Sequence, residues 1–376
     1  MKIAVLREGG PETRVAAIPE TVKKFAGLGA TVAVEKGAGE NASIADADFE
    51  SAGAMIGSRA EVLKGADAIL CVTGPEPGSL KGAKSGALLI GALDPARRGN
   101  DVQAYGAAGI EALAMEWMPR ITRAQSMDIL SSQSNLAGYK AVVDAASVYG
   151  RAFPMMMTAA GTVSPAKAFV MGVGVAGLQA IATARRLGAQ VSATDVRSAT
   201  KEQIASLGAK AIFVEGVAGI EGEGKGGYAG ETSPEYQKAQ AELVSGHIAK
   251  QDIVITTALI PGRPAPRLIS DAQLATMRPG SVIVDLAAEA GGNVEGCVPG
   301  ESVERHGVTI IGAVQLARTL PADSSALFAR NLANFLTAFW DKEKGALALP
   351  DDDEIVQAIR LTKNGAIVNE RLKTAQ

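Results

Sequence analysis

One stretch, Lys167–Arg197, constrains the fold more than any other part of the chain. An apolar run over Ala168–Met171 is typical of a buried parallel strand. A helical segment follows and is expected to stop at Gly188, and a second strand over Gln190–Thr194 ends in Asp195. This order of strand, turn, helix, strand and acidic residue predicts a βαβ unit within a parallel sheet.

The turn after the first strand reads GVGVAG and matches the pattern G-x-G-x-x-G. In this pattern Gly172 makes the tight turn, Gly174 lets the backbone approach a pyrophosphate, and Gly177 lets helix and strand pack closely. The N-terminus of the helix offers free N–H groups and the positive end of its dipole to the phosphates. The glycines alone are a weak signal, but their βαβ context predicts a dinucleotide site.

The residue at the end of the second strand bears on which nucleotide binds. Asp195 lies where a carboxylate accepts both hydroxyls of the adenosine ribose and repels a 2′-phosphate, which favours NAD over NADP. Arg197 favours the opposite choice, because an arginine here can bind a 2′-phosphate. Since the acidic residue comes first, we predict NAD(H).

The remaining pattern indicates an α/β protein with two doubly wound parallel-sheet, Rossmann-like domains joined by long helices. Strands alternate with helices over roughly the first 115 residues, and the alternation resumes in the second half. Between them a proline-free segment predicts one long helix from about Ser126. A later helix after Pro321 has an apolar face that we expect to pack back on the first domain. The predicted boundaries are residues 1–130 plus 320–376, a connecting helix over 131–150, and a nucleotide-binding domain over 151–319.

Composition excludes several other classes of function. The formal net charge of −3 gives no basis for nucleic-acid binding. Two isolated cysteines, Cys71 and Cys297, and two distant histidines, His247 and His306, make a metal site improbable. No run of about 18 apolar residues occurs, so we expect no direct insertion into a membrane.

Several longer stretches together resemble one family over nearly the whole chain. They are PRITRAQSMDILSSQSNLAGYKAV, FPMMMTAAGTV, GVGVAGLQAIATARRLGA, ATDVRSATKEQI, ITTALIPGRPAP, VDLAAEAGGN and LFARNLANFLT. The chain is identified from them as similar to the NAD(H)-binding component, or domain I, of proton-translocating NAD(P)+ transhydrogenases. Alanine dehydrogenases are relatives of that family.

The resemblance implies which residues bind the cofactor. The loop matching Arg120–Ser131 lies in relatives at the nicotinamide end of NAD(H), beside the NADP(H) of the partner component. The matching positions are Arg120, Gln125, Asp128 and Ser131 in this loop, Val175, Asp195, Val196 and Arg197 at the adenosine half, Thr257 and Leu259 along the cleft, and Gly227 and Tyr228 in a segment that closes over the nucleotide. Gln125 and Asp128 would position the nicotinamide. A second interpretation stays open, in which Asp128 and Ser131 only cap the long helix and Tyr228 is merely an exposed side chain.

Departures from alanine dehydrogenases favour the transhydrogenase interpretation. Those enzymes need a lysine and a histidine in the first domain, and Thr73 and Gly91 stand near those places here. Neither residue can act as a general acid. Arg14 matches an arginine that binds the substrate carboxylate in alanine dehydrogenases, but an ion pair with Glu8 or Glu12 explains it equally well.

The resemblance therefore predicts hydride transfer from NADH to NADP+ held on a separate protein, with no residue acting as acid or base. It implies a homodimer that works with an NADP(H)-binding component and membrane-spanning subunits, which couple the transfer to proton movement. The expected location is cytoplasmic, peripheral on the inner face of the plasma membrane. The alternatives are a free-standing NAD-dependent alanine or amino-acid dehydrogenase and a non-catalytic NAD(H) sensor.

Overall fold

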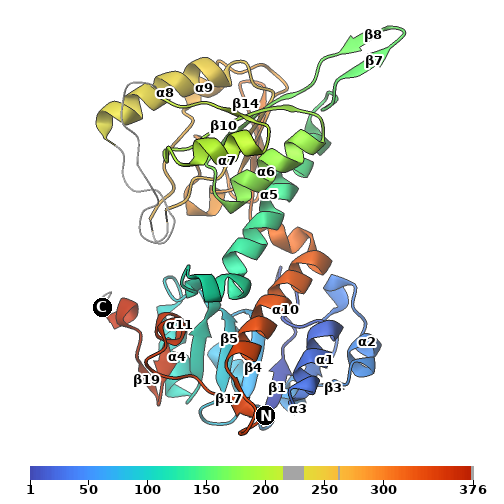
Figure 1. Cartoon of the computed structure of the whole chain (residues 1–376), viewed down its shortest axis with the longest axis vertical. Coiled ribbons are helices and arrows are strands. Elements are labelled where there is room, and N and C mark those ends of the chain that lie inside the picture. The colour runs from blue at the N-terminus through green and yellow to red at the C-terminus, as the bar shows by residue number, and fades with distance from the viewer. Residues whose placement is uncertain (215–232, 261–262, 374–376) are drawn as a thin grey trace. The chain divides into compact units, whose positions relative to one another are not determined.

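A computed structural model of the chain describes residues 1–214, 233–260 and 263–373. The chain divides into two compact units (Figure 1). The first unit contains Met1–Gln133 and Arg318–Gln376, and the second contains Ser134–Ala317.

A six-stranded parallel sheet forms the centre of the first unit, in the order β3-β2-β1-β4-β5-β6. Its strands are β1 (Lys2–Val5), β2 (Thr31–Glu35), β3 (Met55–Gly57), β4 (Ala68–Thr73), β5 (Leu88–Ala92) and β6 (Glu111–Ala114). The strand order reverses between β1 and β4. In open α/β sheets, such a switch point is where ligands bind, at the carboxyl ends of the strands.

Helices cover both faces of this sheet. They are α1 (Pro19–Gly27), α2 (Asp46–Ser51), α3 (Arg59–Leu63), α4 (Gly99–Ala107), α10 (Pro321–Ala338), α11 (Glu354–Ile359) and α12 (Glu370–Lys373), with short 3₁₀ helices η1 (Glu40–Ala42), η2 (Pro77–Leu80), η3 (Met115–Trp117) and η4 (Thr122–Met127). Two hairpins, β16 (Trp340–Asp341) with β17 (Ala346–Leu347) and β18 (Thr362–Lys363) with β19 (Ala366–Ile367), complete the unit. The long helix α5 (Ile129–Val148) runs from the first unit into the second.

Alternation of side chains along the strands gives the first unit two apolar layers. In β1, Ile3 and Val5 face one cluster, whereas Ala4 faces the other. The predicted packing of the helix after Pro321 is confirmed, because Phe328 and Phe335 of α10 lie fully buried in the first of these clusters.

The second unit is built on a seven-stranded sheet in the order β11-β10-β9-β12-β13-β15-β14. Its strands are β9 (Lys167–Met171), β10 (Gln190–Thr194), β11 (Lys210–Ala211), β12 (Ile253–Thr256), β13 (Val282–Asp285), β14 (Ser302–Arg305) and β15 (Val308–Gly312). The helices are α6 (Val175–Arg186), α7 (Thr200–Ser206), α8 (Pro234–Ile248) and α9 (Asp271–Leu274), with η6 (Ala288–Ala290) and η7 (Leu316–Thr319). The order reverses between β9 and β12, so the switch point lies directly beside the glycine-rich turn.

The predicted α/β class with two parallel sheets is confirmed, but short edge elements were missed. Strands β3 and β14 form the outer edges of the two sheets, and β14 runs antiparallel to β15. Edge strands face solvent on one side, so they lack the continuous apolar runs that identified the central strands. A further hairpin of β7 (Met156–Thr158) and β8 (Gly161–Val163) extends away from the sheet of its own unit (Figure 1).

The long helix begins later than predicted. The segment expected to be helical from Ser126 is instead the end of the 3₁₀ helix η4, and Asp128 has extended backbone angles. The α-helix starts at Ile129, because the Asp128 carboxylate accepts the N–H of Ser131 and caps the first turn. Among all described residues, no helix combines the length and apolar character needed to cross a bilayer.

Candidate functional site

The glycine-rich turn of the second unit joins β9 to α6. Gly172 has a φ of +95°, in the left-handed region that residues with a Cβ rarely adopt. A Cβ at Gly177 would lie 1.9 Å from the carbonyl oxygen of Gly172, so α6 packs directly on the turn. Gly174 has extended backbone angles, and a Cβ there would meet nothing within 4 Å. Gly172 and Gly177 therefore have steric roles inside the chain, whereas the approach of a pyrophosphate to Gly174 stays a prediction.

The turn lies at the carboxyl edge of the sheet, beside the end of β12. Met171 pairs with Thr256 in register, which places Thr257 next to Gly172. The Thr257 hydroxyl donates a hydrogen bond of 2.9 Å to the Gly172 carbonyl, and its N–H donates to the Met171 carbonyl at 2.9 Å. Thr257 thus holds the turn in place, whatever else it contacts.

Asp195 follows β10 and is bound to the same turn. One carboxylate oxygen accepts the N–H of Val173 at 2.7 Å. The guanidinium of Arg197 donates to the two oxygens through Nε at 2.9 Å and Nη2 at 3.0 Å. Burial acts to raise the pKa of Asp195, but the hydrogen bonds from Arg197 and the backbone outweigh it and lower the pKa. The acid is therefore ionised and fixed beside the glycines.

Three apolar residues among the predicted site positions lie at or near this edge. Val175, the first residue of α6, is 37% exposed, and Leu259, after β12, is 43% exposed. Val196 is half-buried. Exposed apolar side chains next to a polar turn suit the faces of a nucleoside, which is consistent with the positions that the resemblance assigned to them.

Asn293 is a residue of this edge whose role the sequence analysis did not identify. It is fully buried, and its side-chain nitrogen donates to the carbonyls of Ala258 and Pro266 at 2.9 and 2.8 Å. Its side-chain oxygen accepts the N–H of Ala258 at 3.0 Å. Asn293 therefore fixes the loop after β12, in which Leu259 lies. The string VDLAAEAGGN contained it, but only as part of the resemblance.

Gly138 is a second residue that the pattern did not reveal. A Cβ on this glycine of α5 would lie 2.1 Å from the carbonyl oxygen of Ala176 in α6. The two helices therefore touch backbone to backbone, just after the glycine-rich turn. A glycine inside a helix costs about 1 kcal/mol relative to alanine, and this close contact explains why it is there.

The loop containing Arg120, Gln125 and Asp128 belongs to the first unit. Ser131 donates its N–H and its hydroxyl to the Asp128 carboxylate at 3.0 and 2.6 Å, so these two residues do cap α5. Arg120 and Gln125 are exposed. The capping interpretation is confirmed for Asp128 and Ser131, and their contact with a cofactor stays a prediction that is compatible with it.

Helix α10 holds this loop in place. Asn331 and Asn334 both donate their side-chain amides to the carbonyl of Ser126, at 2.8 and 3.1 Å. Arg123 forms an ion pair with Asp353 at 2.8 Å. The backbone around Gln125 is therefore positioned by helix and C-terminal segments far away in the sequence.

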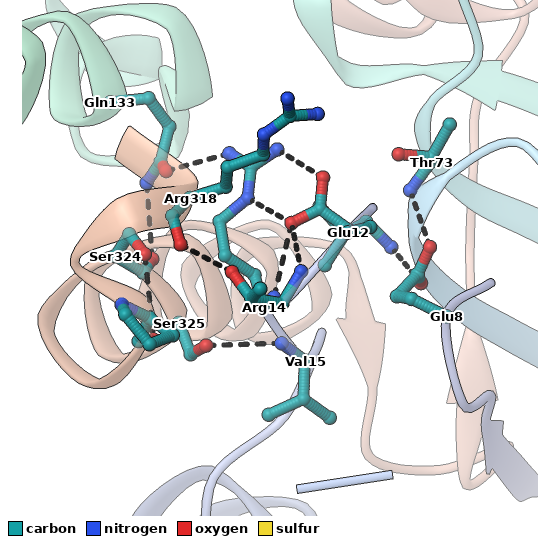
Figure 2. A network of polar contacts seen from close by, with 12 residues as sticks. Glu8, Glu12, Arg14, Val15, Thr73, Gln133, Arg318, Ser324 and Ser325 are labelled. Atoms are coloured by element: carbon teal, nitrogen blue, oxygen red, sulfur yellow. Dashed lines mark hydrogen bonds and ion pairs between the residues drawn. The ribbon is translucent and has the colours of Figure 1, made fainter. Parts of the chain in front are cut away.

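Arg14 is bound within the first unit by an internal carboxylate (Figure 2). Its Nε and Nη2 each donate to Glu12 at 2.7 Å, and its Nη1 donates to the Gln133 side chain at 2.8 Å. Both ion-pair side chains are about nine-tenths buried. Of the two ion-pair partners that the sequence suggested, the structure shows Glu12.

Glu8 occupies the switch point of the first sheet (Figure 2). Its carboxylate accepts the N–H groups of Val72 and Thr73, at 2.6 and 3.1 Å, where β4 ends. Nearby, Gly91 of β5 has no room for a side chain, because a Cβ would lie 2.3 Å from the Cys71 carbonyl oxygen. The strand ends that carry acid–base residues in alanine dehydrogenases are thus filled by the chain itself.

Glu8 predicts a pH dependence of stability. Burial raises its pKa to about 7 against the 4.5 of an unperturbed glutamate. The folded state therefore holds a proton that the unfolded state releases between these values, so the free energy of unfolding falls as the pH rises from 5 to 8. Glu8→Gln is expected to reduce this fall by about 1–3 kcal/mol, given ~1.4 kcal/mol per pKa unit.

Urea unfolding at pH 5 and pH 8, followed by tryptophan fluorescence, measures this effect. Both tryptophans, Trp117 and Trp340, lie in the first unit, so the signal reports on the unit that contains Glu8. Glu116, whose pKa burial also raises to about 7, remains in both proteins, so the difference isolates Glu8. Equal pH dependence in the two proteins would contradict the assignment.

Two predicted positions, Gly227 and Tyr228, lie outside the described residues. Within the residues that are described, no group of three or more His, Cys, Asp or Glu side chains could hold a metal ion. The remaining predicted residues of the second unit gather around the turn after β9. Two doubly wound sheets, one with a glycine-rich turn and an acidic residue at its switch point, define a Rossmann-like protein of the dinucleotide-binding type.

Comparison with known families agrees with this class. The family model described as alanine dehydrogenase/PNT, N-terminal domain, matches residues 4–137, and the corresponding C-terminal domain model matches residues 141–370. The chain is 54% identical to the first of the polypeptides that make up the NAD(P) transhydrogenase alpha subunit of Rhodospirillum rubrum, over 99% of each chain. It is 30% identical to alanine dehydrogenase of Mycobacterium tuberculosis, over 77% of this chain and 72% of that one.

A solved structure gives the same grouping. The crystal structure of a transhydrogenase from Sinorhizobium meliloti is 54% identical and covers 98% of this chain and 100% of its own, with a TM-score of 0.89. The chain therefore belongs to the alanine dehydrogenase/PNT family, on the branch of the NAD(P) transhydrogenase alpha subunits. This confirms the resemblance inferred from the sequence.

Proposed function

We propose that the chain is the NAD(H)-binding component of a proton-translocating NAD(P)+ transhydrogenase and passes hydride between NADH and NADP+ bound to a partner component. The observation that carries this proposal is the 54% identity with the alpha-subunit polypeptide of the Rhodospirillum rubrum transhydrogenase over 99% of both chains. The geometry around the glycine-rich turn adds support that does not depend on the relatives.

NAD(H) would bind to the second unit through its adenosine half. The pyrophosphate would lie over Gly174 at the N-terminus of α6, where unsatisfied N–H groups and the helix dipole favour negative charge. Asp195 would accept the ribose hydroxyls. The resemblance places the nicotinamide near Arg120–Ser131, with Gln125 and Asp128 as positioning residues, and gives Gly227 and Tyr228 a role in closing over the nucleotide.

The proposed reaction needs no acid or base from the protein. A hydride passes from the C4 atom of one nicotinamide to the C4 atom of the other, and no proton is transferred in that step. What the chain supplies is positioning of the nicotinamide and exclusion of water. This agrees with the first unit, where Thr73 and Gly91 stand at the strand ends and Glu12 occupies Arg14.

The proposed partners follow from the same family. They are an NADP(H)-binding component and membrane-spanning subunits that couple hydride transfer to proton movement. The chain would work on the cytoplasmic side, peripheral to the plasma membrane, and would bind no nucleic acid.

We also propose that the chain forms a homodimer through the β7–β8 hairpin. Met155, Met156 and Met157 on and before this hairpin are 60%, 42% and 81% exposed. An isolated two-stranded hairpin is marginally stable in water, and three exposed methionines favour an apolar partner surface. A second copy is the expected partner, as the family resemblance implies.

Met157→Asp is expected to weaken the dimer at least about tenfold, because a charged group would be buried in the interface. Sedimentation velocity across a range of concentrations measures the dissociation constant. Lys167→Asp, an exposed position of the same unit away from the hairpin tip, is the control. Equal dimerisation of wild type and Met157→Asp would contradict the role of the hairpin.

The alternative functions are separated by assays on the chain alone. We expect it to bind NADH in equilibrium dialysis, to prefer NADH to NADPH, and to give no NADH from L-alanine and NAD+. Turnover of L-alanine would instead support an amino-acid dehydrogenase. Tight binding of NADH and of the partner without hydride exchange would support a sensor.

A further inference from the structure

Arg197 and Asp195 form one hydrogen-bonded unit beside the glycine-rich turn. Arg197 donates to Asp195 through its backbone N–H at 2.9 Å, Nε at 2.9 Å and Nη2 at 3.0 Å. Nη2 also donates to the Val173 carbonyl at 3.2 Å. The two residues are only 8% and 7% exposed. The arginine is therefore directed at the acidic residue and the turn.

This pair changes the explanation of nucleotide choice. A lone carboxylate would reject a 2′-phosphate by repulsion, but Asp195 and Arg197 together carry no net charge. Repulsion by the acid is therefore partly cancelled by a cation that lies within hydrogen-bonding distance of it. The remaining difference is that the carboxylate occupies the two-pronged edge of the guanidinium, Nε and Nη2, which binds phosphate equally well.

We propose that Arg197 is a 2′-phosphate-binding residue which Asp195 keeps occupied, so that this ion pair sets the preference for NAD(H) over NADP(H). The inference rests on the proposed function, because it requires the adenosine ribose to lie at Asp195. It extends that function by assigning the specificity to two residues instead of one. The ligand class of the released site is a ribose carrying a 2′-phosphate.

Removal of the acidic charge makes the opposite nucleotide favourable. A nine-tenths buried guanidinium that loses its carboxylate keeps its charge without a counter-ion, which is costly. A 2′-phosphate restores a charge-assisted, two-pronged contact. Asn is the suitable replacement, since its side-chain oxygen can still accept the Val173 N–H that Asp195 binds at 2.7 Å. The turn is therefore expected to keep its conformation in Asp195→Asn.

Calorimetric titration of the full chain with NADH, NADPH and 2′,5′-ADP tests this assignment. Asp195→Asn is expected to bind NADPH and 2′,5′-ADP at least about tenfold more tightly than wild type, and NADH at least about threefold more weakly. The matched variant is Asp195→Asn with Arg197→Met, which removes the proposed phosphate contact. It should lose the gain for both 2′-phosphorylated ligands.

Other outcomes would overturn the proposal. An unchanged affinity of Asp195→Asn for 2′,5′-ADP, with an unchanged Tm, would show that Arg197 is no phosphate-binding residue. A gain that persists in the double variant would assign the phosphate to another group. Asp195→Ser gives the same test if the Asn variant has a lowered Tm. Failure of the wild type to bind NADH at all would instead contradict the proposed function.

Discussion

Gly174→Ala is expected to weaken NADH binding by a factor of about 10–100 and to leave the Tm unchanged. In the chain itself an alanine fits, because its Cβ would meet nothing within 4 Å and the backbone is extended at φ −82° and ψ −165°. The only group that needs the missing Cβ is a ligand approaching the backbone, which is the role of this glycine in a dinucleotide turn. Equilibrium dialysis and thermal unfolding measure the two quantities.

Gly177→Ala is the matched comparison on the same turn. Its Cβ would lie 1.9 Å from the carbonyl oxygen of Gly172, so α6 must move and both the Tm and NADH binding should fall. The contrast distinguishes a glycine kept for the ligand from one kept for packing. NADH binding by Gly174→Ala within twofold of wild type would contradict a pyrophosphate at this turn.

Gln125→Asn is expected to slow hydride transfer about 100-fold while NADH affinity stays within about threefold. The substitution shortens an exposed side chain by one methylene, and misplacement of a reacting group by about 1 Å can cost this much in rate. Stopped-flow measurement of hydride exchange with the partner component gives the rate, and calorimetry gives the affinity.

Gln125 is a better test than Asp128, although both are proposed to position the nicotinamide. Asp128 also caps α5 through Ser131, and loss of such a cap costs about 1 kcal/mol of stability. A change at Asp128 would therefore alter the loop and the site together. Equal loss of binding and rate in Gln125→Asn would assign this residue to binding and contradict its role in the transfer step.

Much of the fold follows from local patterns in the sequence. Buried parallel strands are continuous apolar runs, so β1, β4, β9 and β12 were recognisable, and the glycines marked the switch point of the second sheet. The hairpin signal Asn364–Gly365 was also correct, with φ values of +51° and +82° at the two turn residues. In each case the necessary information lies within a few neighbouring residues.

The features that could not be predicted depend on contacts between distant segments. Gly138 looked like an ordinary helix residue until its contact with Ala176 was known. Asn293 is polar and was expected in a loop, yet it is fully buried and binds a loop about 30 residues earlier. A single sequence does not specify which helix faces will touch, nor which buried polar group satisfies which backbone.

The pairing of Asp195 with Arg197 is an intermediate case. The sequence indicated both residues and set them against each other as alternative signals for NAD and NADP. The structure shows that they are partners in one buried ion pair. Spacing alone gave the two residue types, but only the orientation of the guanidinium shows that one occupies the other.

Hydride exchange between two proteins is the most direct test of the proposed function. The chain, with NADH labelled with deuterium at C4 of the nicotinamide, is mixed with the purified NADP(H)-binding component carrying NADP+, and the label in NADPH is followed by mass spectrometry. We predict deuterium in NADPH only when both proteins are present, and no NADH from L-alanine and NAD+ with this chain alone. Label that never reaches NADPH in a complex loaded with both nucleotides, or turnover of L-alanine by the chain alone, would contradict the account.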